Sequence, residues 1–333
     1  MRNLITDVAG VKVGSAHDPQ LASGVTALIF DAPAVASLAV SGGAPGLRDA
    51  TLLEADMTVQ QIDALVLSGG SAFGLDAMGG VQSALRENGR GFAVAGQLVP
   101  IVPGAILFDL ANGGDKTFWG EPSYWRLGKE AAQQALKSPS PDFRLGSFGA
   151  GHGATLADLK GGLGSASAVT EDGFRVGALV AANAVGQATI GETAHFWAAP
   201  YERDGEFGGL GWPAALAESA LKLKMKGAEP RNTNIAIVAT DAAMTKTQVR
   251  RMAIMAQDGF ARALRPVHAP MDGDTVFAAA TARAKGEVDA IALTRLGAAA
   301  ADCLARAVAR AVFEAEPLPF PGALPSWREK FRR

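Results

Sequence analysis

Short apolar segments separated by glycine-rich turns run through most of this sequence. Such segments predict buried strands when turn residues bound them, and branched residues strengthen the prediction at 235–239. Pro100 and Pro103 favour an edge or bent strand at 99–110, because proline cannot donate to a sheet ladder. Residues 42–49 predict a loop. The strands expected on this basis cover residues 11–14, 24–30, 34–40, 63–67, 99–110, 174–186, 235–239 and 275–280.

Apolar residues at helical spacing predict amphipathic helices before and after the central strands. This spacing occurs at 75–85, 124–136, 249–260 and 287–314. Strands dominate the centre of the chain, so we expect stacked β-sheets covered by helix layers. Two segments lack a periodic pattern. Residues 190–212 predict a mobile loop. The proline-rich tail at 317–325 predicts an ordered or draped extension that Trp327 could anchor.

Composition narrows the class of protein without identifying it. The chain has 333 residues, of which 48% are hydrophobic and 19% charged, so a large core is expected. A net charge of −2 gives no reason to expect a nucleic-acid or membrane partner. The N-terminus lacks the apolar core of a secretory signal and no apolar stretch could span a membrane, so a cytoplasmic location is expected. The single cysteine, Cys303, excludes an internal disulfide framework and has the spacing of a helix-packing residue.

The 40 glycines gather in blocks beside apolar runs. The block after 63–67 forms a strand, glycine turn and helix, which can hold an anion or a carbonyl oxygen at the helix N-terminus. It lacks the Lys and Ser/Thr of a nucleotide-binding P-loop, and the block near Gly149 lacks the third glycine of a dinucleotide site. The four histidines are scattered without metal-binding spacing. No cofactor and no metal are therefore expected.

Asn232 and Thr233 stand directly before the apolar strand at 235–239. A threonine hydroxyl is a poor nucleophile unless a base lies beside it, and a threonine at a chain terminus can use its own α-amine. With a reference pKa near ~8, that amine can accept a proton at neutral pH. The same Asn-Thr pair is also common in ordinary turns. This stretch alone leaves both interpretations open.

Other polar residues in apolar or glycine-rich settings are candidates for the same chemistry. Asn183 interrupts an apolar strand, so its amide is either a structural hydrogen-bonding group or an oxyanion donor. Lys160, flanked by glycines, is either solvated or presents its charge into a cleft. Asp272 and Asp274 bracket Gly273, and they form either a simple turn or a site for the ammonium and hydroxyl groups of a nucleophile.

Seven ordered blocks spread over nearly the whole chain carry a resemblance to one known family. The blocks are ITDVAGVKVG, LSGGSAFGLDA, VPIVPGAILFDL, LKGGLGSAS, VGALVAANAVG, NTNIAIVATDA and DGDTVFA. They resemble the N-terminal-nucleophile hydrolases that include L-aminopeptidase/D-esterases, β-peptidyl aminopeptidases and nylon-oligomer (6-aminohexanoate oligomer) endo-hydrolases. The resemblance implies an α+β fold, an αββα sandwich, made as a precursor that cleaves itself.

Carried onto this sequence, the resemblance implies a cut between Asn232 and Thr233 within one domain, giving an α chain of residues 1–232 and a β chain of 233–333. Thr233 would be the nucleophile and its freed amine the base. The remaining expected site residues are Asp272 and Asp274 to orient and activate Thr233, Lys160 as the site lysine, Asn183 as the oxyanion-hole asparagine, and Tyr124 as a possible substrate-binding residue.

A threonine nucleophile and the Asp-Gly-Asp turn are similar to the nylon-oligomer branch rather than the β-peptidyl branch. The expected function is hydrolysis of amide bonds in small peptides or amino-acid-derived oligomers through a Thr233 acyl-enzyme. The resemblance also implies a homo-oligomer of αβ units. Two alternatives stay open: an acyltransferase of the ornithine-acetyltransferase kind, and an uncleaved binding protein without catalysis.

Overall fold

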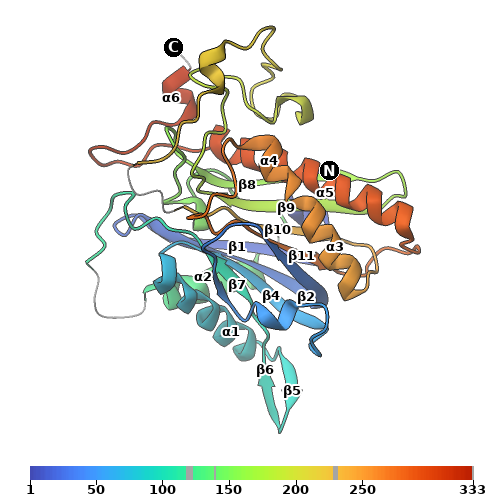
Figure 1. The fold of residues 1–333 in the computed structure, drawn as a ribbon. Coiled ribbons are helices and arrows are strands. Elements are labelled where there is room, and N and C mark those ends of the chain that lie inside the picture. The colour runs from blue at the N-terminus through green and yellow to red at the C-terminus, as the bar shows by residue number, and fades with distance from the viewer. Residues whose placement is uncertain (118–122, 139, 228–231, 332–333) are drawn as a thin grey trace.

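A computed structural model describes residues 1–117, 123–138, 140–227 and 232–331. Two layers of β-strands lie between two layers of helices (Figure 1). Helices α1 (Ala77–Glu87) and α2 (Ser123–Lys137) cover one outer face, while α3 (Lys246–Ala256), α4 (Asp258–Ala263) and α5 (Ala290–Phe313) cover the other. The remaining regular helix is α6, Trp327–Phe331.

The strands form one hydrogen-bonded path in the order β3-β7-β4-β2-β11-β10-β9-β8, with β1 also paired to β2. A separate hairpin contains β5 (Phe92–Val94) and β6 (Gln97–Val99). The strands of the main path are β1 (Val11–Asp18), β2 (Ser23–Val40), β3 (Gly46–Arg48), β4 (Gln61–Ser68), β7 (Gly104–Ile106), β8 (Gly162–Val169), β9 (Arg175–Ala182), β10 (Ile235–Thr240) and β11 (Thr275–Ala280).

The long strand β2 connects the two β layers. Its first half, Val25–Ile29, pairs with β4, and its second half, from Val35 to Val40, pairs with β11. The register shifts between Ile29 and Ala34, around a proline at position 33 that cannot donate a backbone hydrogen bond. The two strands expected at 24–30 and 34–40 are therefore one bent strand, and that expectation was wrong.

Three apolar cores separate the four layers. One lies between β8–β11 and helices α3–α5, one between β2, β4 and helices α1 and α2, and the third between the two β layers. Alternate residues of a strand point to opposite faces, so Ile235 and Ile237 enter the middle core while Ala236 and Val238 face α5. The expected αββα sandwich is confirmed.

Several local expectations need correction. The 99–110 segment is not one strand: Val99 ends β6, and Gly104–Ile106 forms β7, which lies between β3 and β4 rather than at an edge. The loop expected at 42–49 contains the short edge strand β3. The helix expected over 249–260 is divided between α3 and α4. The predictions at 124–136 and 287–314 are confirmed by α2 and α5.

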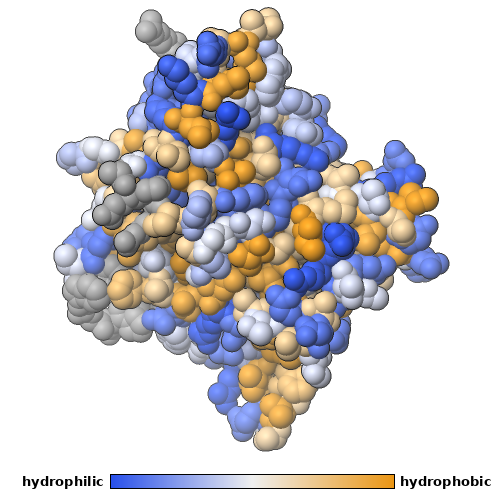
Figure 2. All heavy atoms as spheres, in the orientation of Figure 1, coloured by the Kyte–Doolittle hydropathy of each residue, from blue (hydrophilic) through white to orange (hydrophobic). Residues whose placement is uncertain are grey.

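The hairpin β5–β6 projects from the body of the molecule (Figure 1). Phe92, Val94 and Val99 are exposed on it, and Figure 2 shows apolar surface at this projection. No helix in the described ranges is long and apolar enough to cross a membrane. Cys303 is buried in α5, as its spacing predicted, and burial raises the pKa of its thiol to about 12.

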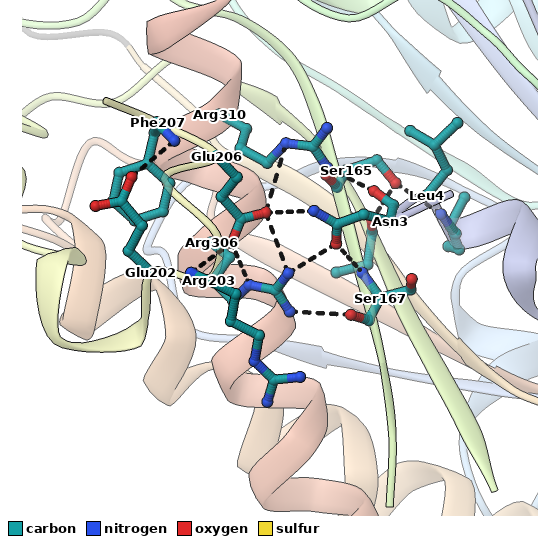
Figure 3. Close-up of polar contacts among 12 residues, drawn as sticks. Asn3, Leu4, Ser165, Ser167, Glu202, Arg203, Glu206, Phe207, Arg306 and Arg310 are labelled. Atoms are coloured by element: carbon teal, nitrogen blue, oxygen red, sulfur yellow. Dashed lines mark hydrogen bonds and ion pairs between the residues drawn. The ribbon is translucent and has the colours of Figure 1, made fainter. Parts of the chain in front are cut away.

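Residues 190–212 are irregular apart from a 3-10 turn at Ala199–Tyr201. Glu206 nevertheless lies in a buried polar cluster, where its carboxylate accepts hydrogen bonds from Arg306 and Asn3 (Figure 3). The expectation of a mobile loop did not foresee this attachment. Trp327 is buried and its ring packs against Phe196 and Phe313, so the tail is anchored as predicted.

Candidate active site

Strand directions bring most of the expected site residues to one end of the sheet. β10 is parallel to β11 and antiparallel to β9, so β10 and β11 begin where β9 ends. Asn183 follows the end of β9, Thr233 precedes β10, and Asp272 and Asp274 precede β11. The backbone N–H of Thr233 donates to the Asn183 carbonyl at 3.1 Å, which joins the first two segments directly.

Thr233 is 3% exposed and lies against the peptide bond that precedes it. Its hydroxyl donates a hydrogen bond to the carbonyl oxygen of Asn232. Gly273 lies close to the same side chain, since a Cβ at position 273 would lie 2.7 Å from Thr233 Oγ1. That distance is shorter than real Cβ contacts, so the site needs a glycine between the two aspartates.

Asp274 is completely buried and its carboxylate is saturated with hydrogen bonds. Oδ1 accepts from the backbone and side-chain nitrogens of Asn234, at 2.9 and 2.8 Å. Oδ2 accepts from the backbone N–H of His268 and lies 2.8 Å from its Nδ1. Asn234 also accepts from the backbone N–H of Asn183, at 3.0 Å, so it links Asp274 to the oxyanion candidate.

Sequence reasoning missed Asn234 and His268. His268 was dismissed because the histidines lack metal-binding spacing, but its contact is with a carboxylate. Asn234 is a polar residue at the start of a buried strand, and the argument applied to Asn183 would have found it.

Asp272 has a different environment from Asp274. It is 1% exposed, and neither carboxylate oxygen has a hydrogen-bond partner among the described residues. Burial and the nearby Asp274 raise the pKa of Asp272 to about 8, against the opposing effect of Lys226. The side-chain amide of Asn232 is also buried, and neither its nitrogen nor its oxygen has a hydrogen-bond partner among the described residues. The neighbourhood of the Asn232–Thr233 bond thus contains polar atoms that are free to take new hydrogen bonds.

The Asn183 side chain is buried and held from several sides. Its Oδ1 accepts from the Thr155 backbone N–H at 3.0 Å and from Lys226 Nζ at 3.2 Å. Its Nδ2 donates to the Phe108 carbonyl at 3.0 Å. An amide NH₂ has two N–H donors, so this contact leaves a second donor for another acceptor. Lys226 was also missed by sequence reasoning, because a lone lysine in an irregular segment carries no pattern.

Lys160 matches neither interpretation offered by the sequence. It is 1% exposed, and its ammonium donates to the carbonyl oxygens of Gly151, Ala154 and Gly161 at 2.8–3.1 Å. It therefore holds the 151–161 loop, which lies behind Asn183 through the Thr155 contact. Burial lowers the pKa of Lys160 to about 7, and Lys226 adds to this effect while Asp109 opposes it.

Tyr124 belongs to a buried network around Asp109. Its hydroxyl donates to Ser23 Oγ at 3.0 Å, and Ser23 in turn donates to Asp109 Oδ2 at 2.6 Å. The backbone N–H of Gly70 donates to Asp109 Oδ1 at 2.8 Å. Burial and Asp109 raise the pKa of Tyr124, so its hydroxyl stays protonated. Asp109 follows Phe108, whose carbonyl accepts a hydrogen bond from Asn183. The sequence did not identify Asp109 as a site residue.

A cavity of about 330 Å³ opens beside Thr155 and Lys226, the two residues that contact Asn183 Oδ1. Its polar wall includes Asn112, Thr155 and Lys226, and its apolar wall comes from the C-terminal tail, with Phe320 and Leu324. Asn112 Nδ2 lies 3.5 Å from Asn183 Oδ1, and Lys226 also contacts that oxygen. The cavity is therefore separated from Thr233 by Asn183.

Solved structures with the same architecture define the class of fold. A β-aminopeptidase of Burkholderia sp. superposes with a TM-score of 0.69 at 21% identity, covering 99% of this chain and 92% of its own. The L-aminopeptidase D-Ala-esterase/amidase of Ochrobactrum anthropi, described as a variant of the Ntn hydrolase fold, gives 0.69 at 20% identity with the same coverage. The chain thus has an Ntn-hydrolase type of fold.

Sequence comparison identifies the family. Residues 3–323 match peptidase family S58. An uncharacterized aminopeptidase of Mycobacterium tuberculosis is 40% identical over 99% of this chain and 98% of its own length. A 6-aminohexanoate-oligomer endohydrolase of Kocuria sp. is 28% identical over 83% of this chain and 74% of its own. The chain belongs to peptidase family S58 and is a hydrolase acting on amide bonds.

Proposed function

We propose that the protein cleaves its own chain between Asn232 and Thr233 and then hydrolyses amide bonds of small peptides or amino-acid-derived oligomers. The observation that carries this proposal is the hydrogen bond from the Thr233 hydroxyl to the Asn232 carbonyl, with Gly273 closing the other side. The products would be an α chain of 1–232 and a β chain of 233–333 within one folded domain.

The self-cleavage step begins with the Thr233 hydroxyl. Its oxygen attacks the Asn232 carbonyl carbon, the bond to the Thr233 nitrogen breaks, and that nitrogen takes up the hydroxyl proton. Water then hydrolyses the resulting ester to a carboxylate at Asn232 and a free hydroxyl at Thr233. Asp272 lies at this bond with neither carboxylate oxygen bonded among the described residues, and it can receive the new amino group.

The same residue then acts on the substrate. The freed amine of Thr233 accepts the hydroxyl proton, the oxygen attacks the amide carbonyl, and the leaving amine takes the proton. Water releases the acyl group from Thr233. Asn183 is the proposed oxyanion donor through its second N–H, while Asp274 fixes Asn234 beside it. Lys160 is proposed to support Asn183 by holding the 151–161 loop. Tyr124 is proposed to support the site through its hydrogen bond to Ser23, which in turn bonds Asp109.

The test is the intact mass of the purified protein. Two masses matching residues 1–232 and 233–333 are expected, together with release of amine from a short peptide. A wild-type enzyme that hydrolyses amides while its chain stays whole would overturn the proposal. A cut chain that needs an acceptor amine for turnover would point to acyl transfer instead.

The association of αβ units into a homo-oligomer is also a proposal, as is a cytoplasmic location. The projecting β5–β6 hairpin supports association, because Phe92, Val94 and Val99 are exposed together on it. Sedimentation of wild type and of a Phe92→Asp variant tests this. An unchanged sedimentation coefficient in the variant would show that the hairpin is not part of the interface.

A further inference from the structure

We propose that the cavity beside Asn183 is a subsite for a carboxylate group of the substrate, which Lys226 binds while the tail residues around Phe320 cover the apolar part of the molecule. This inference rests on the proposed function, because it concerns the substrate of the same site. The expected substrate class is a short peptide or amino-acid-derived amide with a free carboxylate.

Lys226 has a position suited to this role. It is partly buried and it lines the cavity. Among the described residues its ammonium makes two long contacts, to Asn183 Oδ1 at 3.2 Å and to the Thr155 carbonyl at 3.4 Å. Neither acceptor is an ion. A carboxylate in the cavity would give this ammonium a charge-assisted hydrogen bond, which is stronger than a bond to a neutral acceptor.

The surroundings of Lys226 favour an anion. Asp109 interacts with Lys116, Lys160 and Lys226, so three ammonium groups share this buried region. Among the described residues the opposing carboxylates are Asp109 and Asp272, and burial raises the pKa of both, which favours their neutral forms. Burial lowers the pKa of Lys226 to about 8, and a bound carboxylate would offset that cost.

Lys226 is attached independently of the bond that is cut. Its backbone N–H donates to the Val185 carbonyl at 3.0 Å, and Lys224 forms ion pairs with Asp158 and Glu192. The ammonium therefore stays beside Asn183 when the chain opens at residue 232. The Thr233 N–H bonds to the Asn183 carbonyl and Lys226 bonds to the Asn183 side chain, so the nucleophile and the cavity lie on two sides of one residue. A substrate that extends past Asn183 would contact both.

The apolar wall completes the site. Phe320 packs on Gly113, where a Cβ would lie 2.6 Å from the ring, and the Lys160 backbone N–H holds the tail at the Pro325 carbonyl at 2.8 Å. The tail is thus fixed at the cavity. A ligand with an apolar body and a terminal carboxylate matches these two walls.

The experiment measures binding and turnover separately. Hexanoate and hexanamide differ only in the charged group, so calorimetry with the purified wild-type protein compares them directly. We expect hexanoate to bind about tenfold more tightly, as one charge-assisted hydrogen bond allows. Lys226→Gln should remove the difference and Lys226→Arg should keep it. Lys222→Gln, at an exposed lysine of the same segment, is the matched control and should behave as wild type.

Turnover of one peptide as its free acid and as its C-terminal amide gives the second readout. We expect the wild-type kcat/KM to favour the acid about tenfold, and Lys226→Gln to abolish this ratio through KM. Equal binding of hexanoate and hexanamide would overturn the subsite, whatever the turnover. A variant that loses activity equally on both peptides would also overturn it, since Lys226 would then act only by holding Asn183. Selective hexanoate binding without any hydrolysis would leave the subsite standing and would refute the proposed function.

Discussion

The Thr233 hydroxyl is hydrogen-bonded to the carbonyl oxygen of Asn232, the residue directly before it in the chain. A hydroxyl in this position is next to the carbon that it would attack. The contact is buried, and Gly273 limits the movement of the side chain. The uncut chain therefore already has the geometry from which a chain break at residue 233 can start.

Thr233→Ala should leave a single chain of 333 residues without hydrolytic activity, because the attacking oxygen is gone while the neighbouring bonds remain. Intact mass and a peptide-hydrolysis assay measure both effects. Thr240→Ala is the matched control: it makes the same change in β10, where the hydroxyl accepts a hydrogen bond from the Ala242 N–H. That variant should be cut normally. Two fragments from Thr233→Ala would contradict the assignment of the nucleophile.

Gly273→Ala should slow self-cleavage by about tenfold or more, because small displacements of reacting groups are costly. The new methyl group would lie 2.7 Å from Thr233 Oγ1 and 2.9 Å from the Ala44 carbonyl, so the threonine must move. The fraction of cut chain after a fixed time of expression gives the effect. Gly79→Ala in α1 is a suitable control, since its nearest contact is 3.3 Å away. Equal processing of the two variants would mean that Gly273 does not position Thr233.

The strands and helices were largely predictable, but the site was not. Periodicity identified α2, α5 and the strands around Asn183 and Thr233, since burial fixes one face of each element. It could not show that β10 is parallel to β11 and antiparallel to β9, and this arrangement brings Thr233, Asn183 and Asp272 together. Pairing between distant segments leaves no local pattern. The family resemblance supplied the grouping of these site residues but not the strand directions.

One physical cause explains why the sequence did not identify Lys226 and His268 as site residues. Lys226 and His268 lie in irregular segments, where a single polar side chain is usually solvated. Their roles depend on burial by segments far away in the sequence, such as the strand end at Asn183 for Lys226. The same cause explains Lys160, whose three carbonyl partners come from a loop that has no recognizable period.

Asp272→Asn should stabilise the folded protein more at high pH than at low pH. The pKa of Asp272 is raised to about 8 by burial and by Asp274, so the folded state binds a proton that the unfolded chain releases near pH 4. Stability from this group is complete below that pH and is lost as pH rises towards 8. The difference in Tm between variant and parent should therefore grow from pH 5 to pH 9. Both proteins should carry Thr233→Ala, so that chain cleavage does not change the comparison. A constant difference across this range would show that Asp272 does not titrate as described.

Asn183→Ala should lower kcat by about 10²–10³ with a smaller effect on KM, as expected when an oxyanion donor is lost. The side chain also bonds Thr155 and Phe108, so the Tm of the variant must be measured alongside its kinetics. Asn88→Ala is the control, since Asn88 follows the end of α1, outside the site, and its side chain bonds the Ala84 carbonyl. An unchanged kcat in a folded Asn183→Ala enzyme would exclude the oxyanion role.

The buried ion pair between Glu206 and Arg306 gives a prediction about stability (Figure 3). Arg306 Nε donates to Glu206 Oε1 at 2.5 Å, and its guanidinium also bonds the Ser167 carbonyl at 2.9 Å. Removing one partner of a buried pair leaves an unpaired charge, which typically costs about 3–5 kcal/mol. Glu206→Leu should therefore lower the free energy of unfolding by roughly that amount.

The double variant Glu206→Leu with Arg306→Met should be more stable than Glu206→Leu alone, because the buried Arg306 charge is then no longer left unpaired. Arg310 loses its 3.7 Å contact with Glu206 in both variants alike, so it does not affect the comparison. Glu206 belongs to residues 1–232 and Arg306 to 233–333, so cleavage at Asn232 turns this pair into a contact between two chains. In the cut protein, Glu206→Leu should release the β chain at a lower urea concentration than the parent does. The uncut Thr233→Ala background has no separate chain to release and is the control. Urea titration followed by size-exclusion chromatography measures this release. Equal urea midpoints for the single and the double variant would show that the pair contributes nothing to holding the two chains together.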